Sequence, residues 1–196
     1  MPNKVFLITD MVDGFCKYGV FANPAQLALW PEIDRVAKIF DEEGEQIDVI
    51  EEGHEKGSTE FLTYPEHCVI GSGEENTIEE LQWIYTTKGA TVVRVRKNST
   101  CVGTTGKYWE LIPQGTAVAV VAGGTTCICA FQTALWAKKQ SDEYNQPVRV
   151  VIVKNLVATY DAPGHPREHW ENIVWEMCAL NGIEVVDTYE DIDFDK

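Results

Sequence analysis

The feature that most constrains the fold is the alternation of short runs rich in β-branched residues with longer segments of helical periodicity. Two of the runs, Val118–Val121 and Val150–Val153, are apolar at every position, which is typical of central strands covered by helices on both faces. Strands that alternate with helices are joined by right-handed crossovers and form a mainly parallel sheet. The sequence therefore predicts an α/β fold of three layers. The predicted strands are Val5–Ile8, Asp48–Ile50, Ala90–Val95, Thr116–Ala122, Arg149–Val153 and Ile183–Val186.

Four segments between these runs have helical periodicity together with start and stop residues. Prolines begin two of them, and Thr77 and Glu80 are spaced as a capping box for another. The predicted helices run from Pro31 to Gly44, from Thr77 to Gly89, from Ile128 to Lys139 and from Pro166 to Gly182. Neither an internal repeat nor a linker-like segment interrupts the pattern. Residues 1–196 are therefore predicted to form a single domain.

Charge and composition exclude several function classes. The 196 residues are 44% hydrophobic and 24% charged, as in ordinary globular proteins. Sixteen Lys and Arg against 31 Asp and Glu give a net charge of −15, which repels nucleic-acid phosphates and anionic membranes. The sequence contains neither a signal-peptide pattern nor an apolar run approaching the about 20 residues that cross a bilayer. We expect a soluble, cytoplasmic protein that binds neither nucleic acid nor membrane, and we expect its six cysteines to be mostly buried thiols.

Polar side chains follow the first four predicted strands. Asp10 follows the first strand, Glu52 and His54 the second, Lys97 the third and Cys129 the fourth. In open parallel sheets, ligands bind beyond the carboxyl ends of the strands. We therefore expect these side chains to converge at one edge of the sheet and to form the functional site.

Cys129 is a candidate nucleophile. It follows a Gly-Gly-Thr-Thr turn and lies in the first turn of the predicted helix Ile128–Lys139. Backbone N–H groups at a helix N-terminus lower the pKa of a thiol and can receive an oxyanion. The alternative is a small buried core residue. A metal or redox pair with Cys127 is disfavoured, because C-x-C lacks the thioredoxin spacing and no second pair accompanies it.

Asp10 and Lys97 could assist this cysteine. Asp10 could act as the base that takes the thiol proton, and Lys97 as the cation that stabilises a thiolate or oxyanion. The alternative interpretations are a strand-ending aspartate in a turn and a solvated lysine. Position alone leaves both interpretations open.

Glu52, His54 and His67 form a candidate metal site. One carboxylate and two imidazoles suit a divalent cation that keeps coordination positions for water or substrate. The alternative is that these histidines are surface or hydrogen-bonded residues. The other two histidines, His165 and His169, flank a predicted helix start and are interpreted as structural.

Five segments of the chain carry motifs that occur together in one enzyme family. Tyr64–Ser72 is similar to the signature Pro-x-His-Cys-x-x-Gly-Thr, and Gly123–Cys129 to Gly-Val-Ala-Thr-Asp-x-Cys. The other matching segments are Val5–Phe15, Arg96–Thr100 and Ala158–Asp161. On these residues the sequence resembles the isochorismatase-like cysteine hydrolases, and among them the nicotinamidase-type amidases.

The resemblance implies a six-stranded parallel sheet of order 3-2-1-4-5-6 and an Asp-Lys-Cys triad. Asp10 is expected to deprotonate Cys129 and to pass the proton to departing ammonia while Lys97 holds the charges. Water then hydrolyses the thioester. The family's cis peptide falls at Gly124–Thr125, and the N–H groups of Thr125 and Cys129 are expected to receive the oxyanion.

The resemblance also implies substrate and metal contacts. Phe15 is expected to stack on a planar substrate, with a core aromatic as the alternative, and Gly124 to contact the substrate. The family's metal ligands are Asp-x-His and a later His, so Glu52, His54 and His67 are expected to hold zinc or a similar divalent ion. Here the carboxylate is one methylene longer, and Gly53 stands where the family has tryptophan. Two further positions also depart from the family pattern, with Cys127 in place of an acid and Cys101 in place of an asparagine.

The function expected from the sequence is that of a cysteine amidase. It would hydrolyse a small planar amide and release ammonia. The expected substrate is nicotinamide, which gives nicotinate. One alternative is a sister amidase acting on a carbamoyl or ureido compound, and another is a non-catalytic small-ligand-binding protein on the same fold. Isochorismatases cleave a vinyl ether without a thiol, so Cys129 disfavours that branch. If the protein assembles, we expect a homo-oligomer.

Overall fold

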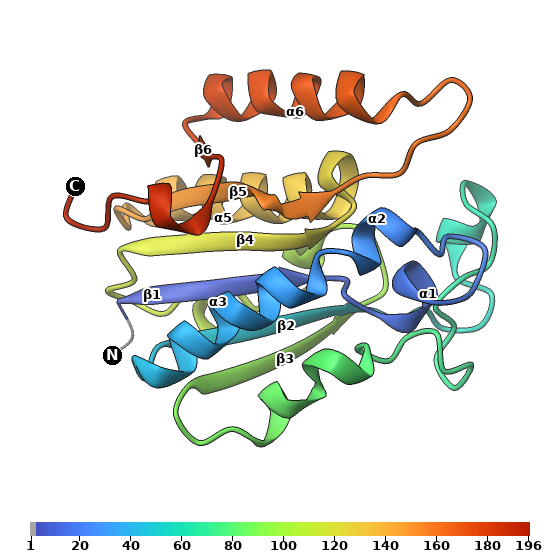
Figure 1. The fold of residues 1–196 in the computed structure, drawn as a ribbon, viewed down its shortest axis with the longest axis horizontal. Coiled ribbons are helices and arrows are strands. Elements are labelled where there is room, and N and C mark those ends of the chain that lie inside the picture. Colours follow the sequence, from blue (N-terminus) through green and yellow to red (C-terminus); the bar gives the residue numbers. More distant parts are fainter. Residues whose placement is uncertain (1–2) are drawn as a thin grey trace.

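A six-stranded parallel sheet forms the middle of the molecule, as the sequence predicts. The computed structural model describes residues 3–196. The strands lie in the order β3-β2-β1-β4-β5-β6, and every neighbouring pair is parallel. Their carboxyl ends point towards the right-hand side of Figure 1. The strands are β1 (Lys4–Thr9), β2 (Gln46–Glu52), β3 (Thr91–Lys97), β4 (Val118–Gly124), β5 (Arg149–Ala158) and β6 (Glu184–Val186).

Helices cover both faces of the sheet. In Figure 1, α3 lies in front of the sheet and α5 lies behind it, and α6 packs against α5 and β6. The helices are α1 (Asp13–Cys16), α2 (Pro24–Leu27), α3 (Trp30–Glu42), α4 (Tyr108–Leu111), α5 (Phe131–Glu143) and α6 (Arg167–Asn181). Short 3₁₀ segments span Thr59–Leu62, Glu79–Thr86, Val102–Thr105 and Tyr189–Asp191. Within residues 3–196, no helix is long and apolar enough to cross a membrane.

Strand β1 shows why the chain folds into three layers. Phe6 and Ile8 are buried against the α3 side of the sheet, whereas Val5 and Leu7 are buried against the α5 side. Successive side chains of a strand point to opposite faces, so a run that is apolar throughout needs a cover on both sides. The central strands are thereby held rigidly, and the residues that follow them have fixed positions.

The segment after Thr77 differs from the prediction. Glu79–Thr86 is a 3₁₀ helix without a side-chain cap, so the predicted capping box of Thr77 and Glu80 is wrong. The Thr77 hydroxyl instead lies 2.7 Å from Oε1 of the buried Glu51, which also binds Arg94. Tertiary hydrogen bonds thus replace the local cap. The Glu51 carboxylate therefore binds Thr77 and Arg94. It does not belong to the cluster that contains its neighbour Glu52.

The turn that carries Cys129 also differs in detail. A single π-helical turn, Thr126–Ala130, precedes α5, which begins at Phe131 rather than near Ile128. The Ala130 N–H donates to the Thr125 carbonyl at 3.2 Å, which closes the wider turn. The Gly124–Thr125 peptide bond is cis, as the family resemblance implies. Cys129 is therefore presented by an irregular turn and not by a regular helix N-terminus.

Candidate active site

Three predicted catalytic residues meet at the carboxyl ends of β1, β3 and β4. The Lys97 ammonium lies 2.9 Å from Oδ2 of Asp10 and also forms an ion pair with Oε2 of Glu52. The Cys129 sulfur lies 3.9 Å from the same Glu52 oxygen. All four side chains are buried. The strand order explains the convergence, because β1 lies between β2 and β4, and β3 borders β2.

Asp10 is held at the point where β1 ends. Its φ of +54° lies in the left-handed region, which aspartate tolerates better than most residues, and this conformation ends the strand. Its N–H donates to the Ile50 carbonyl at 2.8 Å, and its carbonyl accepts from the Gln26 side chain at 2.7 Å. The backbone of Asp10 is therefore fixed on both sides, which keeps the carboxylate against Lys97.

The charges in this cluster set the protonation states. Burial raises the pKa of Asp10 to about 7, although Lys97 opposes the shift. Burial also acts to raise the pKa of Glu52, but Lys97 and His54 outweigh it and hold that pKa at about 2. At neutral pH Glu52 is thus ionised, while Asp10 is poised to accept or release a proton.

The thiol of Cys129 does not have the lowered pKa that its position in the sequence suggested. Burial, together with the nearby carboxylates of Asp10 and Glu52, raises its pKa well above the usual value despite the Lys97 charge. Burial and the two carboxylates thus outweigh the N–H groups of the turn, contrary to the expected lowering of the thiol pKa. The sulfur is a thiol at rest, so its proton has to move to a neighbouring base during the reaction.

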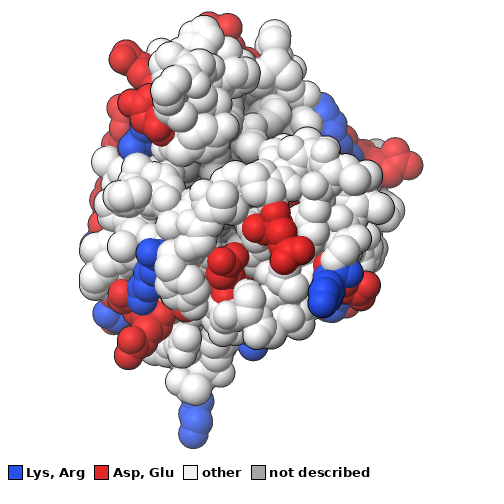
Figure 2. Space-filling view, turned by 90° about the vertical axis from the view of Figure 1, so that its right-hand side faces the viewer, with Lys and Arg blue, Asp and Glu red and all other residues white. Residues whose placement is uncertain are grey.

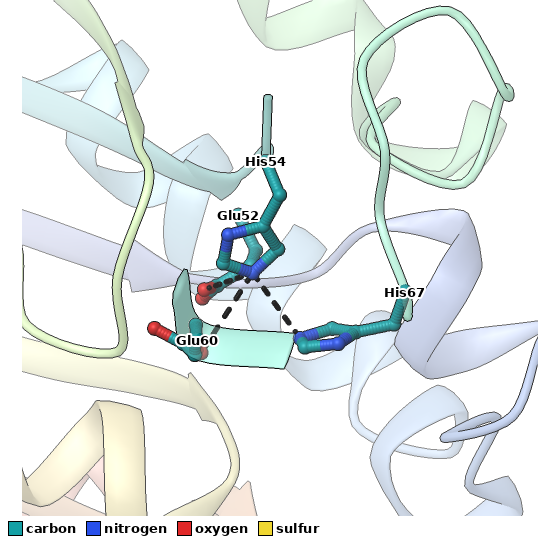
Figure 3. Close-up of side chains that lie close together, drawn as sticks. All are labelled: Glu52, His54, Glu60 and His67. Carbon is teal, nitrogen blue, oxygen red and sulfur yellow. Dashed lines mark hydrogen bonds and ion pairs between the residues drawn. The ribbon is translucent and has the colours of Figure 1, made fainter. Parts of the chain in front are cut away.

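A second cluster lies beside the first and shares Glu52 with it. Nε2 of His54 lies 2.9 Å from Oε1 of Glu52, 3.3 Å from Nε2 of His67 and 3.7 Å from Oε1 of Glu60 (Figure 3). Suitable ligand atoms of all four residues lie within 4.8 Å of one another. The three predicted ligands are thus brought together, and a fourth side chain joins them.

The outer hydrogen bonds of the two histidines show that this cluster suits a metal ion. Nδ1 of His54 lies 3.0 Å from the side-chain oxygen of Asn98, and Nδ1 of His67 lies 2.8 Å from the Pro65 carbonyl. Both partners are acceptors, so each Nδ1 carries a proton and each Nε2 turns towards the other. Two imidazole nitrogens that face each other between carboxylates are held together by a proton on one of them or by a bound cation, and two nitrogens with two carboxylates are a donor set that fits zinc.

Glu60 was not identified from the sequence. It lies in the 3₁₀ turn Thr59–Leu62, where Ser58 accepts a hydrogen bond from the Glu60 N–H at 3.4 Å. An acidic residue in a polar connecting segment usually faces solvent, and nothing in its spacing from His54 and His67 distinguishes it. Only the folded path of the segment brings its carboxylate to the histidines.

A cavity of about 380 Å³ opens beside both clusters. The predicted residues Phe15, Thr125 and Cys129 line it, together with Glu52 and His67. The remaining lining residues are Val20, Phe21, Ala22, Asn23, Pro24, Glu60, Tyr64, Thr100, Ile128, Tyr160 and Asp161. Such a volume suits a small molecule. The thiol and the four-residue cluster can therefore act on the same bound ligand.

Gly124 and Cys127 both lie outside the cavity wall. Gly124 packs against the side chain of Gln26, and a Cβ atom there would lie 2.1 Å from the Gln26 oxygen. Cys127 lies 3.2 Å from the Thr159 hydroxyl and 3.5 Å from Nε2 of His165. Neither residue lines the cavity, so Cys129 is the cysteine that a ligand meets.

The geometry agrees with what comparison with known proteins shows. Residues 4–188 match the family profile described as "Isochorismatase domain". The chain belongs to the isochorismatase family, as the sequence motifs suggested. A curated relative, Nicotinamidase 1 of Arabidopsis thaliana, is 26% identical over 92% of this chain and 84% of its own length. Family membership indicates that the chain is an enzyme of the hydrolase class.

Solved structures confirm the fold. A nicotinamidase/pyrazinamidase of Acinetobacter baumanii superimposes with a TM-score of 0.76 at 17% identity, over 98% of this chain and 99% of that one. A pyrazinamidase of Pyrococcus horikoshii in complex with zinc gives 0.73 at 20% identity, over 95% and 99%. An N-carbamoylsarcosine amidase of Thermoplasma acidophilum gives 0.71 at 19% identity, over 99% of each chain.

Proposed function

We propose that the protein is a cysteine amidohydrolase that releases ammonia from a small planar amide, with nicotinamide as the best candidate substrate. The observation that carries the proposal is the buried group of Asp10, Lys97 and Cys129 beside a cavity that Cys129 lines. A ligand-binding protein without catalysis has no need of a buried nucleophile, a base and a cation in contact. The nicotinamidase relative favours nicotinamide among planar amides.

The first half of the reaction forms a thioester. The Cys129 sulfur attacks the amide carbon while its proton moves to the Asp10 carboxylate, and the carbonyl oxygen becomes an oxyanion. We assign the N–H groups of Thr125 and Cys129 as its hydrogen-bond donors. The C–N bond then breaks as Asp10 passes its proton to the leaving nitrogen, which departs as ammonia. A base with a pKa of about 7 suits both transfers.

The second half releases the acid. Asp10, again a carboxylate, takes a proton from a water molecule as that water attacks the thioester carbon. The C–S bond breaks, Asp10 returns the proton to the sulfur, and the product leaves as a carboxylic acid. Lys97 remains an ammonium throughout, because Asp10, Cys129 and Glu52 raise its pKa well above the usual value against the effect of burial. It offsets the fixed charge of Glu52 and the negative charge that passes between Asp10 and the substrate-bound Cys129.

Glu52, His54, Glu60 and His67 are the residues that would hold a divalent metal ion, zinc being the ion that the donor set fits best. A bound ion supplies a Lewis-acid position for the ring nitrogen of a pyridine-type amide. Glu52 holds both clusters in a fixed relation, because one carboxylate oxygen faces His54 and the other faces Lys97.

Aromatic side chains on the cavity wall can receive a planar ring. Phe15 and Phe21 have ring centroids 6.2 Å apart, and Phe21 contacts the His67 ring edge-on at 4.8 Å. Tyr64 stands edge-on to Phe21 at 6.3 Å. These rings lie on the same side as His67, so a flat amide placed between them and Cys129 can present its carbonyl carbon to the sulfur.

Ammonia release from a panel of amides tests this function. We expect turnover of nicotinamide and pyrazinamide, slower turnover of benzamide, which lacks the ring nitrogen, and little from a ureido compound. Benzamide is the matched control for the ring nitrogen. A protein that folds and binds zinc but releases no ammonia from any of these amides would contradict the proposal.

A further inference from the structure

Within the described residues 3–196, no lysine or arginine side chain lines the cavity beside Cys129. In the same part of the chain, the charged side chains that line the cavity are those of Glu52, Glu60 and Asp161. Figure 2 views the edge formed by the carboxyl ends of the strands. Acidic side chains lie in the middle of this face, among uncharged atoms, and basic side chains lie nearer its outline. A substrate carboxylate would therefore enter a site without a partner of opposite charge.

Two of these carboxylates belong to the metal cluster. Glu52 is paired with the buried Lys97 ammonium, which also contacts Asp10 and is itself outside the cavity wall. Glu60 lies 3.7 Å from Nε2 of His54, and a divalent ion held by this cluster would lie against it. Each of these two carboxylates therefore has a positive group, or the place for one, beside it.

Asp161 is the carboxylate that remains uncompensated. Its only hydrogen bond within residues 3–196 comes from the Arg167 N–H, at 3.4 Å. The Arg167 side chain is directed elsewhere, since its Nε lies 3.0 Å from Oε1 of Glu171. Asp161 is exposed and lines the cavity wall, so a substituent that reaches this part of the wall meets its charge.

The position of Asp161 is built by the segment around it. His165 is stacked between Tyr160, at a centroid distance of 3.9 Å, and Trp170, at 5.0 Å. Its Nδ1 also lies 3.1 Å from the Tyr160 carbonyl. Two backbone hydrogen bonds between Ala162 and His165 close the turn. Asp161 lies between these fixed points, so it is held at the wall rather than on a free loop.

We propose that Asp161 is a specificity-determining residue that selects neutral and cationic planar amides over amides carrying a carboxylate. This inference rests on the proposed amidase function and narrows its substrate class. Like charges repel more strongly at a partly enclosed site than in bulk water. Carboxylate-bearing carbamoyl compounds would consequently be poor substrates, and a cationic substituent directed at Asp161 would be favoured.

Three pyridine-3-carboxamides that differ only at ring position 5 test this selection. Their substituents are aminomethyl, hydroxymethyl and carboxylate, which are cationic, neutral and anionic. The kcat/KM of each is measured, or its inhibition constant against nicotinamide where turnover is slow. We expect the wild type to prefer the cation over the anion by about 100-fold. Asp161→Asn should reduce this ratio about tenfold and Asp161→Lys about tenfold further, each step equal to about 1.4 kcal/mol.

The neutral compound and a control variant keep the outcomes separate. The hydroxymethyl compound is the neutral reference, so the values for the cation and the anion are expressed relative to it in every variant. Asp142→Asn, an exposed change on α5 outside the cavity wall, should leave the ratio unaltered. A ratio that does not move in the Asp161 variants, or an equal loss for all three compounds, overturns the selection while nicotinamide turnover still supports the amidase. Absence of hydrolysis of nicotinamide itself overturns the amidase and the selection together.

Discussion

The catalytic cluster and the cavity wall of this site are built in different ways. Asp10, Lys97 and Cys129 follow or end three strands of one sheet and are buried close together around Asp10. Glu60 and Asp161, by contrast, lie on connecting segments that are held by their own local hydrogen bonds and ring contacts. The sheet thus fixes the reacting groups, while the connections determine which ligand reaches them.

This difference predicts different consequences of mutation. A change in the buried cluster removes a group that acts on the reacting atoms, so it should reduce kcat strongly. A change in a connecting segment should alter metal or substrate affinity and leave the chemical step largely intact. Each experiment below tests whether the two parts separate in this way.

The largest effect is expected for Cys129→Ala, which should abolish ammonia release because it removes the nucleophile. The fold should remain, since alanine fills most of the thiol's space and the hydrogen bonds of Asp10 stay in place. Circular dichroism and a thermal melt check the fold. Cys127→Ser is the matched control and should keep substantial activity, because Cys127 is outside the cavity wall. Turnover by Cys129→Ala, or faster iodoacetamide labelling of Cys127, would show that the nucleophile is misassigned.

The next largest effect is expected for Asp10→Asn, which preserves the side-chain shape but not the base. A general acid–base group contributes about 10²–10⁴-fold to the rate, so kcat should fall by that factor. Combined with Cys129→Ala, it should add little further loss, because the two residues act as a unit. Single-turnover measurements of ammonia release check this. A nearly normal rate in Asp10→Asn would be incompatible with the mechanism.

Lys97→Met should reduce the rate similarly and also destabilise the fold. Removing the ammonium leaves Asp10 and Glu52 buried without their common cation, and breaking a buried ion pair costs about 3–5 kcal/mol. Chemical denaturation should therefore show a lower unfolding free energy than in Asp10→Asn. Equal stability of the two variants would mean that Lys97 does not compensate these carboxylates.

The same contrast explains what the sequence could reveal. The apolar runs located the strands, and the residues that follow them marked Asp10, Lys97 and Cys129 as one group. The strand order came from the family resemblance alone, because the runs do not say which strands are neighbours. Glu60 was missed, because an acidic residue in a loop looks like a solvated one until the chain is folded. The raised pKa of Cys129 was missed for a related reason, since it depends on burial and on two carboxylates from other strands.

For the metal cluster, we expect zinc affinity to depend on all four ligands. His54→Ala combined with His67→Ala should abolish stoichiometric zinc in elemental analysis, and Glu60→Gln should weaken zinc binding in calorimetry. In the wild type, a chelator should raise the KM for nicotinamide more than that for benzamide, because benzamide has no ring nitrogen. Unchanged zinc content in the double variant would exclude this site as the metal centre.

A smaller effect is expected from Asn98→Ala, which removes the acceptor for Nδ1 of His54. Loss of such an outer hydrogen bond typically lowers metal affinity about 10–100-fold. Asn181→Ala on α6, remote from the cluster, is the matched control. Zinc titrations followed by calorimetry measure both. An unaltered affinity in Asn98→Ala would show that the His54 ring is oriented by other contacts.

The smallest effect is expected at His165, whose role is to position the Tyr160–Asp161 wall. His165→Phe keeps a ring between Tyr160 and Trp170. Because the aromatic contacts remain, the KM for nicotinamide should stay within about threefold of the wild-type value. His165→Ala removes two ring contacts, each worth about 0.5–1.5 kcal/mol, and should raise KM about tenfold with kcat unchanged. If His165→Phe is as harmful as His165→Ala, the hydrogen bond to the Tyr160 carbonyl holds the wall instead of the stack. If kcat falls by the same factor as KM rises, the wall also affects the chemical step. The connecting segments would then not act on substrate affinity alone.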